Sequence, residues 1–192
     1  MGISQDSSAL MSLEKRAFFD IYKKNHFNDI RQERRIKQRI REVMVDYNSR
    51  MDRLGLQKIS DRIYRESRRY DYDPFLLTAL IVTESSFHRQ AKSNRGALGL
   101  MQIRLNTGAS LAPEANISWK GQRTLFDPEH NIALGALYLN KLRKRFKDMH
   151  LALEAYNHGP SQLSRYLRQG KIPRSYSRKV IRIYNQIRSN QI

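Results

Sequence analysis

One apolar segment in the middle of the chain most constrains how it can fold. The pair Asp73-Pro74 precedes it. Such a pair is typical of a helix start, because aspartate caps the free backbone N–H groups and proline fits the first helical position. The residues from Phe75 to Val82 that follow are apolar on nearly every side of the expected helix. A surface helix would keep a polar face, so the segment predicts a helix buried at the centre of a domain.

The composition favours helices around that central segment. Of 192 residues, 40% are hydrophobic and 28% are charged, and the chain holds only 9 Gly and 5 Pro. It is therefore too apolar for a disordered chain and too poor in turn residues for a sandwich of short strands. Its length excludes two large domains. We expect a mainly α protein with little strand.

Start and stop residues divide the second part of the chain into further helices. A second such pair, Asp127-Pro128, predicts another helix start, and Gly170 and Pro173 separate the last two helices. We expect one helix from about Ile59 to Arg69, a second that starts at Pro74, a third from Pro128 to about Phe146 and a short fourth that ends near Tyr156. A turn from Asn157 to Pro160 and two final helices follow.

The first part of the chain predicts a basic amphipathic helical segment, residues 1–56, ahead of a catalytic domain at residues 57–192. From about Ser12 to Leu56 it is charged and rich in helix-forming residues, and Gly55 suits a helix C-cap. The apolar stripe of an amphipathic helix can dock on the rest of the protein or bind a partner helix. Its basic face can attract a membrane surface, an anionic envelope polymer or nucleic acid. The apolar stripe consists of Ile36, Ile40, Val43, Tyr47, Met51 and Leu54.

The charge of the chain indicates an anionic partner. Lys and Arg total 36 against 18 Asp and Glu, a formal charge of +18. The absence of cysteine excludes disulfides and thiolate zinc sites, and His26, His88 and His150 have no metal-ligand spacing. We expect no metal and no cofactor. We also expect no signal peptide and no membrane span in this chain, since no suitable apolar run occurs.

Glu84 is the main candidate for chemistry. It follows Leu77, Leu80 and Ile81 at helical spacing, so its carboxyl group lies on the side of buried residues. Burial and the negative end of the helix both raise the pKa of such a carboxyl, which makes it a candidate general acid. A purely structural carboxylate, tied to an Arg or a backbone donor, is the alternative.

Four blocks of residues follow one another along the second part of the chain. They are Glu84-Ser85 with Phe87, Ala91, Ser93 and Gly96 to Ile103; Asn131-Ile132 with Gly135 and Tyr138-Leu139; Ala155 to Pro160; and Gly170 to Pro173 with Tyr176 and Lys179-Val180. In this order the blocks resemble the soluble lytic transglycosylases of bacterial peptidoglycan metabolism, and the resemblance extends from about Ile59 to Ile187. Leu105 and His158 depart from it, where the family often has a proline and a small residue.

This resemblance implies a lysozyme-like fold and an activity. The family cleaves the β-1,4 bond between N-acetylmuramic acid and N-acetylglucosamine without water, and it leaves a 1,6-anhydro sugar. By similarity Glu84 is the acid and then the base, and Tyr176 hydrogen-bonds to it. The resemblance also places Ser85, Met101 and Gln102 on the floor near the cleaved bond, and Tyr156 and Asn157 on the sugar. Peptidoglycan is then the expected partner, and the periplasm or cell envelope the expected location.

Three other functions compete with this one. A goose-type lysozyme-like hydrolase shares the fold and the acid, but inversion needs a second carboxylate that activates water. Between Ser85 and Phe126 the only acidic residue is Glu114. A non-catalytic envelope scaffold that binds glycan leaves Glu84 unexplained, and a nucleic-acid binder explains the charge but not the ordered blocks. Second carboxylates from elsewhere in the chain could be Glu66, Asp71, Asp73 or Asp127.

Overall fold

The computed structural model describes residues 29–48 and 51–189, and the chain forms two compact units, residues 1–37 and 38–192. In the first unit, residues 29–37 are helical, and Lys37 Nζ lies 2.5 Å from Glu33 Oε1. The expected helix start near Ser12, and His26, lie outside the described residues. The second unit contains all four sequence blocks.

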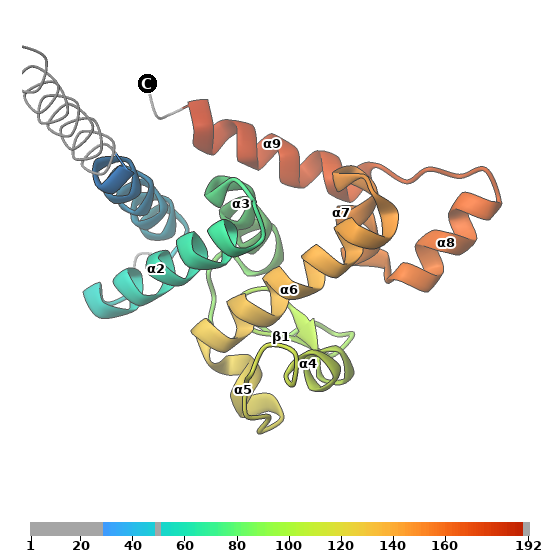
Figure 1. The fold of residues 1–192 in the computed structure, drawn as a ribbon, viewed down its shortest axis with the longest axis horizontal. Helices are drawn as coiled ribbons and strands as arrows, with labels where there is room; N and C mark the ends of the chain where they lie inside the picture. The colour runs from blue at the N-terminus through green and yellow to red at the C-terminus, as the bar shows by residue number, and fades with distance from the viewer. Residues whose placement is uncertain (1–28, 49–50, 190–192) are drawn as a thin grey trace, which may run out of the picture. The chain divides into compact units, whose positions relative to one another are not determined.

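Helix α3, Pro74–Ser85, lies at the centre of this unit, as the sequence predicts. The Asp73 side chain caps it by accepting a hydrogen bond from the Phe75 N–H, at 2.9 Å. Every side chain from Phe75 to Val82 is buried. Helices α2, Arg53–Arg69, and α9, Ser175–Ser189, pack against α3 (Figure 1). The apolar surface of α3 is therefore covered by helices from both ends of the unit.

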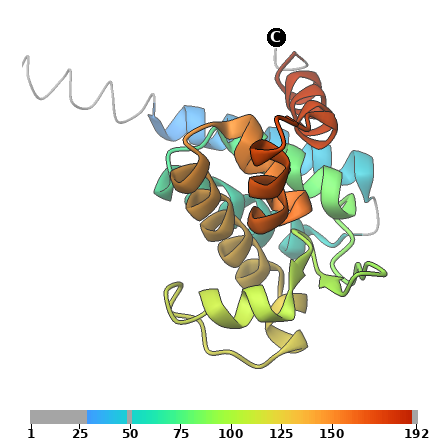
Figure 2. The ribbon, with the colours of Figure 1, turned by 90° about the vertical axis from the view of Figure 1, so that its right-hand side faces the viewer.

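Helix α6, Pro128–Phe146, forms a second support that packs against α2 and α7. Asp127 caps it, accepting from the His130 N–H at 2.8 Å, so the second Asp-Pro prediction is also confirmed. Helix α7, Met149–His158, is followed by α8, Pro160–Arg168, and both α7 and α3 contact α9. In the turned view, α4 and α5 lie at one end of the unit and α9 at the other (Figure 2).

A two-stranded antiparallel hairpin connects α3 to the rest of the unit. Strand β1, Ala97–Leu98, pairs with β2, Ile103–Arg104, so that Ala97 faces Arg104 and Leu98 faces Ile103. The short helices α4, Leu105–Leu111, and α5, Gln122–Phe126, follow. The prediction of a mainly α fold with little strand is confirmed.

Two expected helix ends are wrong. Gly55 is not a C-cap, because α2 starts at Arg53 and the Asp52 side chain accepts a hydrogen bond from the Gly55 N–H at 2.8 Å. This capping places Gly55 in the first turn of α2 and starts that helix well before Ile59. Helix α7 continues to His158, so Asn157 is helical and does not belong to a turn.

Part of the N-terminal stripe is confirmed as a docking face. Residues 38–47 are helical, and among them Ile40 and Val43 are buried, together with Met44. Tyr47 and Leu54 are exposed, which the stripe did not predict. The docking interpretation therefore holds for Ile40 and Val43, whose side chains belong, with that of Met44, to the core of the second unit.

Candidate active site

Glu84 lies in the last turn of α3, where the chain reverses through two left-handed residues, Ser86 at φ 48° and Phe87 at φ 61°. Such a backbone is costly for residues other than glycine and needs support from its surroundings. Phe87 supplies some of that support, since its side chain is fully buried. Glu84 itself is half-buried and borders a cleft.

Burial raises the pKa of the Glu84 carboxyl, which is the expected direction for a general acid. A hydrogen bond from Tyr176 and the charge of Lys179 act against this rise. The Tyr176 hydroxyl donates to Glu84 Oε1 from the first turn of α9. Burial and the neighbouring carboxyl also raise the pKa of Tyr176, so the phenol keeps its proton and remains a donor.

Glu84 opens onto a cleft of about 430 Å³ between the hairpin and the C-terminal end of α7. Gln102, Tyr156 and Asn157, three of the residues expected at the site, line it. The rest of the lining comes from the hairpin region, α4, α6, the end of α7 and the start of α8: Ser93, Arg95, Ala97, Ile103, Arg104, Thr107, Tyr138, His158, Gly159 and Pro160.

Three expected residues do not line the cleft. Tyr176 reaches the site only through its hydrogen bond to Glu84. The Ser85 hydroxyl donates to the Leu100 carbonyl at 2.8 Å, so it ties α3 to the hairpin. Met101 is fully buried, and a Cβ placed on Gly135 would lie 2.4 Å from its sulfur. The Ser85 and Met101 side chains hold the floor of the cleft from below, because they join the hairpin to α3 and α6.

The cleft residues are fixed by the backbone around them. Gln102, at φ 48°, donates from Nε2 to the Gly99 carbonyl at 2.9 Å and to the Ala91 carbonyl at 3.2 Å. The Tyr156 hydroxyl donates to the Met101 carbonyl at 2.8 Å, and its ring lies 5.2 Å from that of Tyr138. Asn157 is exposed at the end of α7. Its side chain is therefore accessible from the cleft.

Asn131 clamps the hairpin to α6, a role that the sequence block did not reveal. Its buried amide accepts from the Met101 N–H at 2.7 Å and donates to the carbonyls of Leu98 and Leu125 at 3.0 and 2.8 Å. One side chain thus satisfies two backbone groups of the hairpin and one of α5. Only the three-dimensional arrangement brings these groups together, so spacing in the sequence carries no sign of them.

The sequence reasoning also missed three charged residues at the site. Arg95 and Arg104 line the cleft. Glu154 lies behind it, fully buried in α7. The pattern that identified Glu84 could have identified Glu154 too, since it also stands as a lone charge among apolar neighbours, from Leu151 to Ala155.

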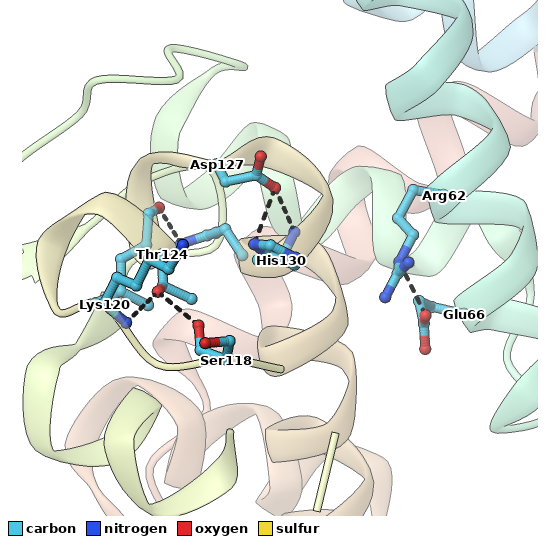
Figure 3. A network of polar contacts seen from close by, with 9 residues as sticks. Arg62, Glu66, Ser118, Lys120, Thr124, Asp127 and His130 are labelled. Carbon is cyan, nitrogen blue, oxygen red and sulfur yellow. Dashed lines mark hydrogen bonds and ion pairs between the residues drawn. The ribbon is translucent and has the colours of Figure 1, made fainter. Parts of the chain in front are cut away.

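The other carboxylates considered from the sequence are engaged away from the cleft. Glu66 lies 2.9 Å from Arg62 Nε, and Asp127 caps α6 beside His130 (Figure 3). Asp73 caps α3 and accepts from Tyr184 at 2.8 Å, Glu114 pairs with Lys141, and Asp71 is exposed. Glu84 is the one carboxylate that lines the cleft within the described residues.

Among residues 29–48 and 51–189, no three His, Asp or Glu side chains gather in a group able to hold a metal ion. No helix in those ranges is long and apolar enough to cross a membrane.

A mainly helical unit with one carboxyl at the end of its central helix, facing a polar cleft, defines a lysozyme-like domain. The Transglycosylase SLT domain matches residues 61–177, more than half of the chain. The chain therefore belongs to the transglycosylase SLT domain family.

Relatives and solved structures agree with this family. The chain is 34% identical over 124 residues to a transglycosylase of Enterobacteria phage PRD1, covering 65% of this chain and 42% of the relative. It is 33% identical to the membrane-bound lytic murein transglycosylase C of Edwardsiella ictaluri, covering 59% and 34%. The 70 kDa soluble lytic transglycosylase of Escherichia coli is similar in structure, with a TM-score of 0.61 at 26% identity over 68% of this chain and 24% of that one. The chain thus spans less than half the length of these proteins.

Proposed function

We propose that this chain is a peptidoglycan lytic transglycosylase that cleaves the β-1,4 bond between N-acetylmuramic acid and N-acetylglucosamine. The observation that carries the proposal is the position of Glu84, with its pKa raised by burial, on a cleft lined by no other described carboxylate. A hydrolase of the goose-type lysozyme kind needs a second carboxylate to activate water. The family match and the names of the relatives support the same reaction.

In the proposed reaction Glu84 acts twice. As an acid it gives its proton to the glycosidic oxygen while the bond from that oxygen to C1 breaks. The substrate's own acetamido carbonyl stabilises the positive charge that develops at C1. The Glu84 carboxylate then takes the proton of the C6 hydroxyl, whose oxygen bonds to C1. Protons balance over the two steps, and the muramyl residue ends as a 1,6-anhydro sugar.

The other cleft residues have supporting roles in this proposal. Tyr176 orients the Glu84 carboxyl by donating a hydrogen bond to it. Asn157 and the Tyr156 ring border the space next to Glu84 and are placed to contact the sugar, and Gln102 forms part of the floor. Ser85 and Met101 act indirectly, because their contacts hold the hairpin in place.

The substrate implies a place of action. Peptidoglycan lies in the bacterial cell envelope, so we propose that the chain acts there, in the periplasm or on the wall. Its charge of +18 suits a polymer that carries peptide and lactyl carboxylates.

Mass analysis of digested, purified peptidoglycan tests the reaction. A transglycosylase releases muropeptides that end in 1,6-anhydro-muramic acid and are lighter by one water than lysozyme products. A hydrolase releases reducing ends instead. If reducing ends predominate, the lytic reaction is wrong and the goose-type lysozyme-like alternative replaces it.

Glu84→Gln tests the residue. We expect turnover to fall by about 10²-fold to 10⁴-fold for each proton transfer that Glu84 performs, with glycan binding retained. Glu114→Gln is the matched control, since it removes an exposed carboxylate that pairs with Lys141 outside the cleft. A Glu84→Gln variant as active as the control would make Glu84 a structural carboxylate. Glycan binding without turnover in the unmodified protein would favour a scaffold.

A further inference from the structure

Glu154 is a buried carboxylate that the proposed reaction does not use. Its exposed fraction is 0%, and it lies in α7, two residues before Tyr156. An ionised carboxylate removed from water costs several kcal/mol unless charged or hydrogen-bonding partners surround it. The partners that the fold supplies therefore indicate what Glu154 does.

The first partner is the N-terminal turn of α9. Glu154 Oε1 accepts a hydrogen bond from the Ser177 N–H at 2.8 Å. Helix α9 starts at Ser175, so this N–H is one of the first-turn donors that have no acceptor within their own helix. A negative charge at a helix N-terminus is also favourable. Glu154 thus caps α9 from a neighbouring helix.

The residue next to this cap is Tyr176, whose hydroxyl donates to Glu84. A single peptide unit separates the group that Glu154 holds from the residue that touches the proposed acid. Ser177, the residue whose N–H Glu154 holds, is fully buried. A shift of the first turn of α9 would therefore move the Tyr176 hydroxyl relative to Glu84.

The second partner of Glu154 lies on the cleft wall. Glu154 Oε2 is 3.4 Å from His158 Nε2, one turn further along α7, and neither atom makes a hydrogen bond with the described residues. His158 lines the cleft, and its ring stands edge-on to Tyr166 of α8 at 5.6 Å. Glu154 therefore lies between the cleft wall and the turn that carries Tyr176.

We propose that Glu154 is a positioning residue, which holds the first turn of α9 so that Tyr176 stays hydrogen-bonded to Glu84. The inference rests on the proposed function, because it concerns the acid of that reaction. His158 closes the other side of the Glu154 carboxylate and keeps it directed at the turn. Glu154 itself does not line the cleft, so in this proposal its effect on Glu84 passes through the α9 turn and Tyr176.

The pathway of contacts from Glu154 through the α9 turn and Tyr176 to Glu84 predicts that changing Glu154 alters the pH dependence of the reaction. Glu84 is faced by Tyr176 and Lys179 of α9 and by Tyr156 of α7. Of these, the hydrogen bond from Tyr176 holds the pKa of Glu84 down against burial. Losing that bond raises the pKa of Glu84, so the fall in kcat at high pH, where the acid loses its proton, moves to higher pH.

A double-mutant cycle between Glu154 and Tyr176 tests the pathway. Glu154→Ala and Tyr176→Phe should each lower kcat on peptidoglycan more than they change KM. Both should also shift the high-pH limb, the part of the pH profile in which kcat falls, to higher pH. The double variant should be no slower than Tyr176→Phe alone, since both changes remove one interaction. Independent effects, with the two factors multiplied in the double variant, would overturn the proposal.

Two conservative variants separate positioning from a general loss of stability. Glu154→Gln keeps an oxygen that can accept from the Ser177 N–H, so it should restore most of kcat and the wild-type pH limb. Glu154→Asp keeps the charge but is one methylene too short, so it should behave like Glu154→Ala, and it provides the measurement if the alanine variant does not fold. An aspartate variant with the wild-type rate and pH limb would overturn the proposal.

Glu66→Gln is the matched control for a buried carboxylate, since Glu66 is 2% exposed and lies away from the cleft. With rates expressed per folded molecule, it should leave kcat and the pH limb unchanged. A shifted limb in this control would also overturn the proposal.

If Tyr176→Phe has wild-type kinetics while Glu84→Gln is inactive, this inference fails and the proposed function stands. If the unmodified protein yields no anhydro products, the proposed function fails first.

Discussion

At the scale of single residues, the burial of Glu84 favours the proposed reaction but costs folding stability. A carboxyl placed where burial raises its pKa suits proton donation, but the same burial penalises the ionised form that must follow. Tyr176 offsets part of this penalty by donating to the carboxylate. The proposed acid is therefore held between two opposing effects, and stability as a function of pH reports their balance.

Glu84→Gln should stabilise the fold at neutral pH. The folded-state pKa of Glu84 is raised above its ordinary value of 4.5. Below that value both the folded and the unfolded chain carry a protonated Glu84, and the variant gains nothing. As pH rises through the raised pKa, the unfolded chain ionises more easily, so the wild type loses stability that the glutamine keeps. Thermal unfolding of both proteins across pH 4 to 8 measures the difference.

The difference in melting temperature should be close to zero at pH 4 and grow toward pH 8. Glu114→Gln should show no such growth, because its carboxylate is exposed. A gap between Glu84→Gln and the wild type that stays constant with pH would contradict the raised pKa.

The sequence identified site residues that stand out in a local pattern or a family block. It missed residues whose role depends on packing between distant segments. Glu84 stands out as a charge in an apolar helix, and Gln102, Tyr156 and Asn157 came from the family blocks; all four line the cleft. Ser85 and Met101 came from the same blocks but face the hairpin and the core. A block shows that a residue matters near a site, whereas only the fold shows which way its side chain points.

At the scale of elements, the hairpin is held against α6 with almost no space to spare. A Cβ on Gly135 would lie 2.4 Å from the Met101 sulfur and 2.7 Å from its Cβ, which real contacts essentially never show. The Asn131 amide fastens the backbone of the same turn. The position of the cleft floor, and so of Gln102, depends on this close approach.

Gly135→Ala should destabilise the fold by about 1–3 kcal/mol, because added volume in a packed core forces side chains and backbone apart. Alanine favours the helix by roughly 1 kcal/mol over glycine, so any net loss is due to the clash. Met101→Ala should cost less stability in the Gly135→Ala background than in the wild type, since it removes the sulfur that the new methyl group meets. Denaturant unfolding of both single variants and the double variant gives the coupling energy. Strict additivity would mean that the helix and hairpin do not press on each other at this point.

Helix starts were predictable where a capping residue and a proline coincide, and the ends expected at Arg69 and about Phe146 were also correct, whereas the end expected at Gly55 was wrong. Asp73 and Asp127 each cap the expected helix. Gly55 looked like a helix end, but Asp52 caps α2 just ahead of it and includes the glycine in the first turn. A glycine fits both a helix end and a helix interior, so its meaning depends on its neighbours.

At the scale of the whole molecule, the unit that carries the site is larger than the family domain. The family matches residues 61–177, but the compact unit starts at residue 38. Ile40, Val43 and Met44 contribute buried side chains to its core. Asn48 donates from Nδ2 to the Phe87 carbonyl at 3.0 Å, in the left-handed turn directly after Glu84. Residues that precede the family domain thus brace the turn that ends the helix of the proposed acid.

Asn48→Ala isolates that brace with a single change. The Phe87 carbonyl would lose its partner, which costs about 1–3 kcal/mol for a group kept from water. We expect a lower melting temperature and a lower kcat, since the turn that fixes Glu84 loosens. Asn185→Ala, on α9 and outside the cleft that Glu84 borders, is the control and should change neither quantity. Unchanged stability and rate in Asn48→Ala would mean that the turn is held by Phe87 alone.

Two truncations separate the roles of the N-terminal residues. A chain that begins at Gln38 keeps the whole second unit, so it should fold and cleave glycan strands at close to the full rate. A chain that begins at Leu56 lacks Ile40, Val43, Met44 and the Asn48 brace, and it also starts inside α2; since one large buried side chain is worth about 2–5 kcal/mol, this chain should unfold. The basic residues that the first truncation removes should matter for attachment to the cell wall instead. The chain that begins at Gln38 should bind intact sacculi more weakly than the full chain at 0.1 M salt, where the Debye length is about 10 Å. This difference in binding should vanish near 1 M salt, where the Debye length is about 3 Å. Sedimentation with sacculi at both salt concentrations, beside circular dichroism and product analysis, measures all three properties. A stable, active chain from Leu56 onward would place the functional boundary near residue 56 after all, and equal binding of the Gln38 chain at low salt would remove the electrostatic role of the first unit.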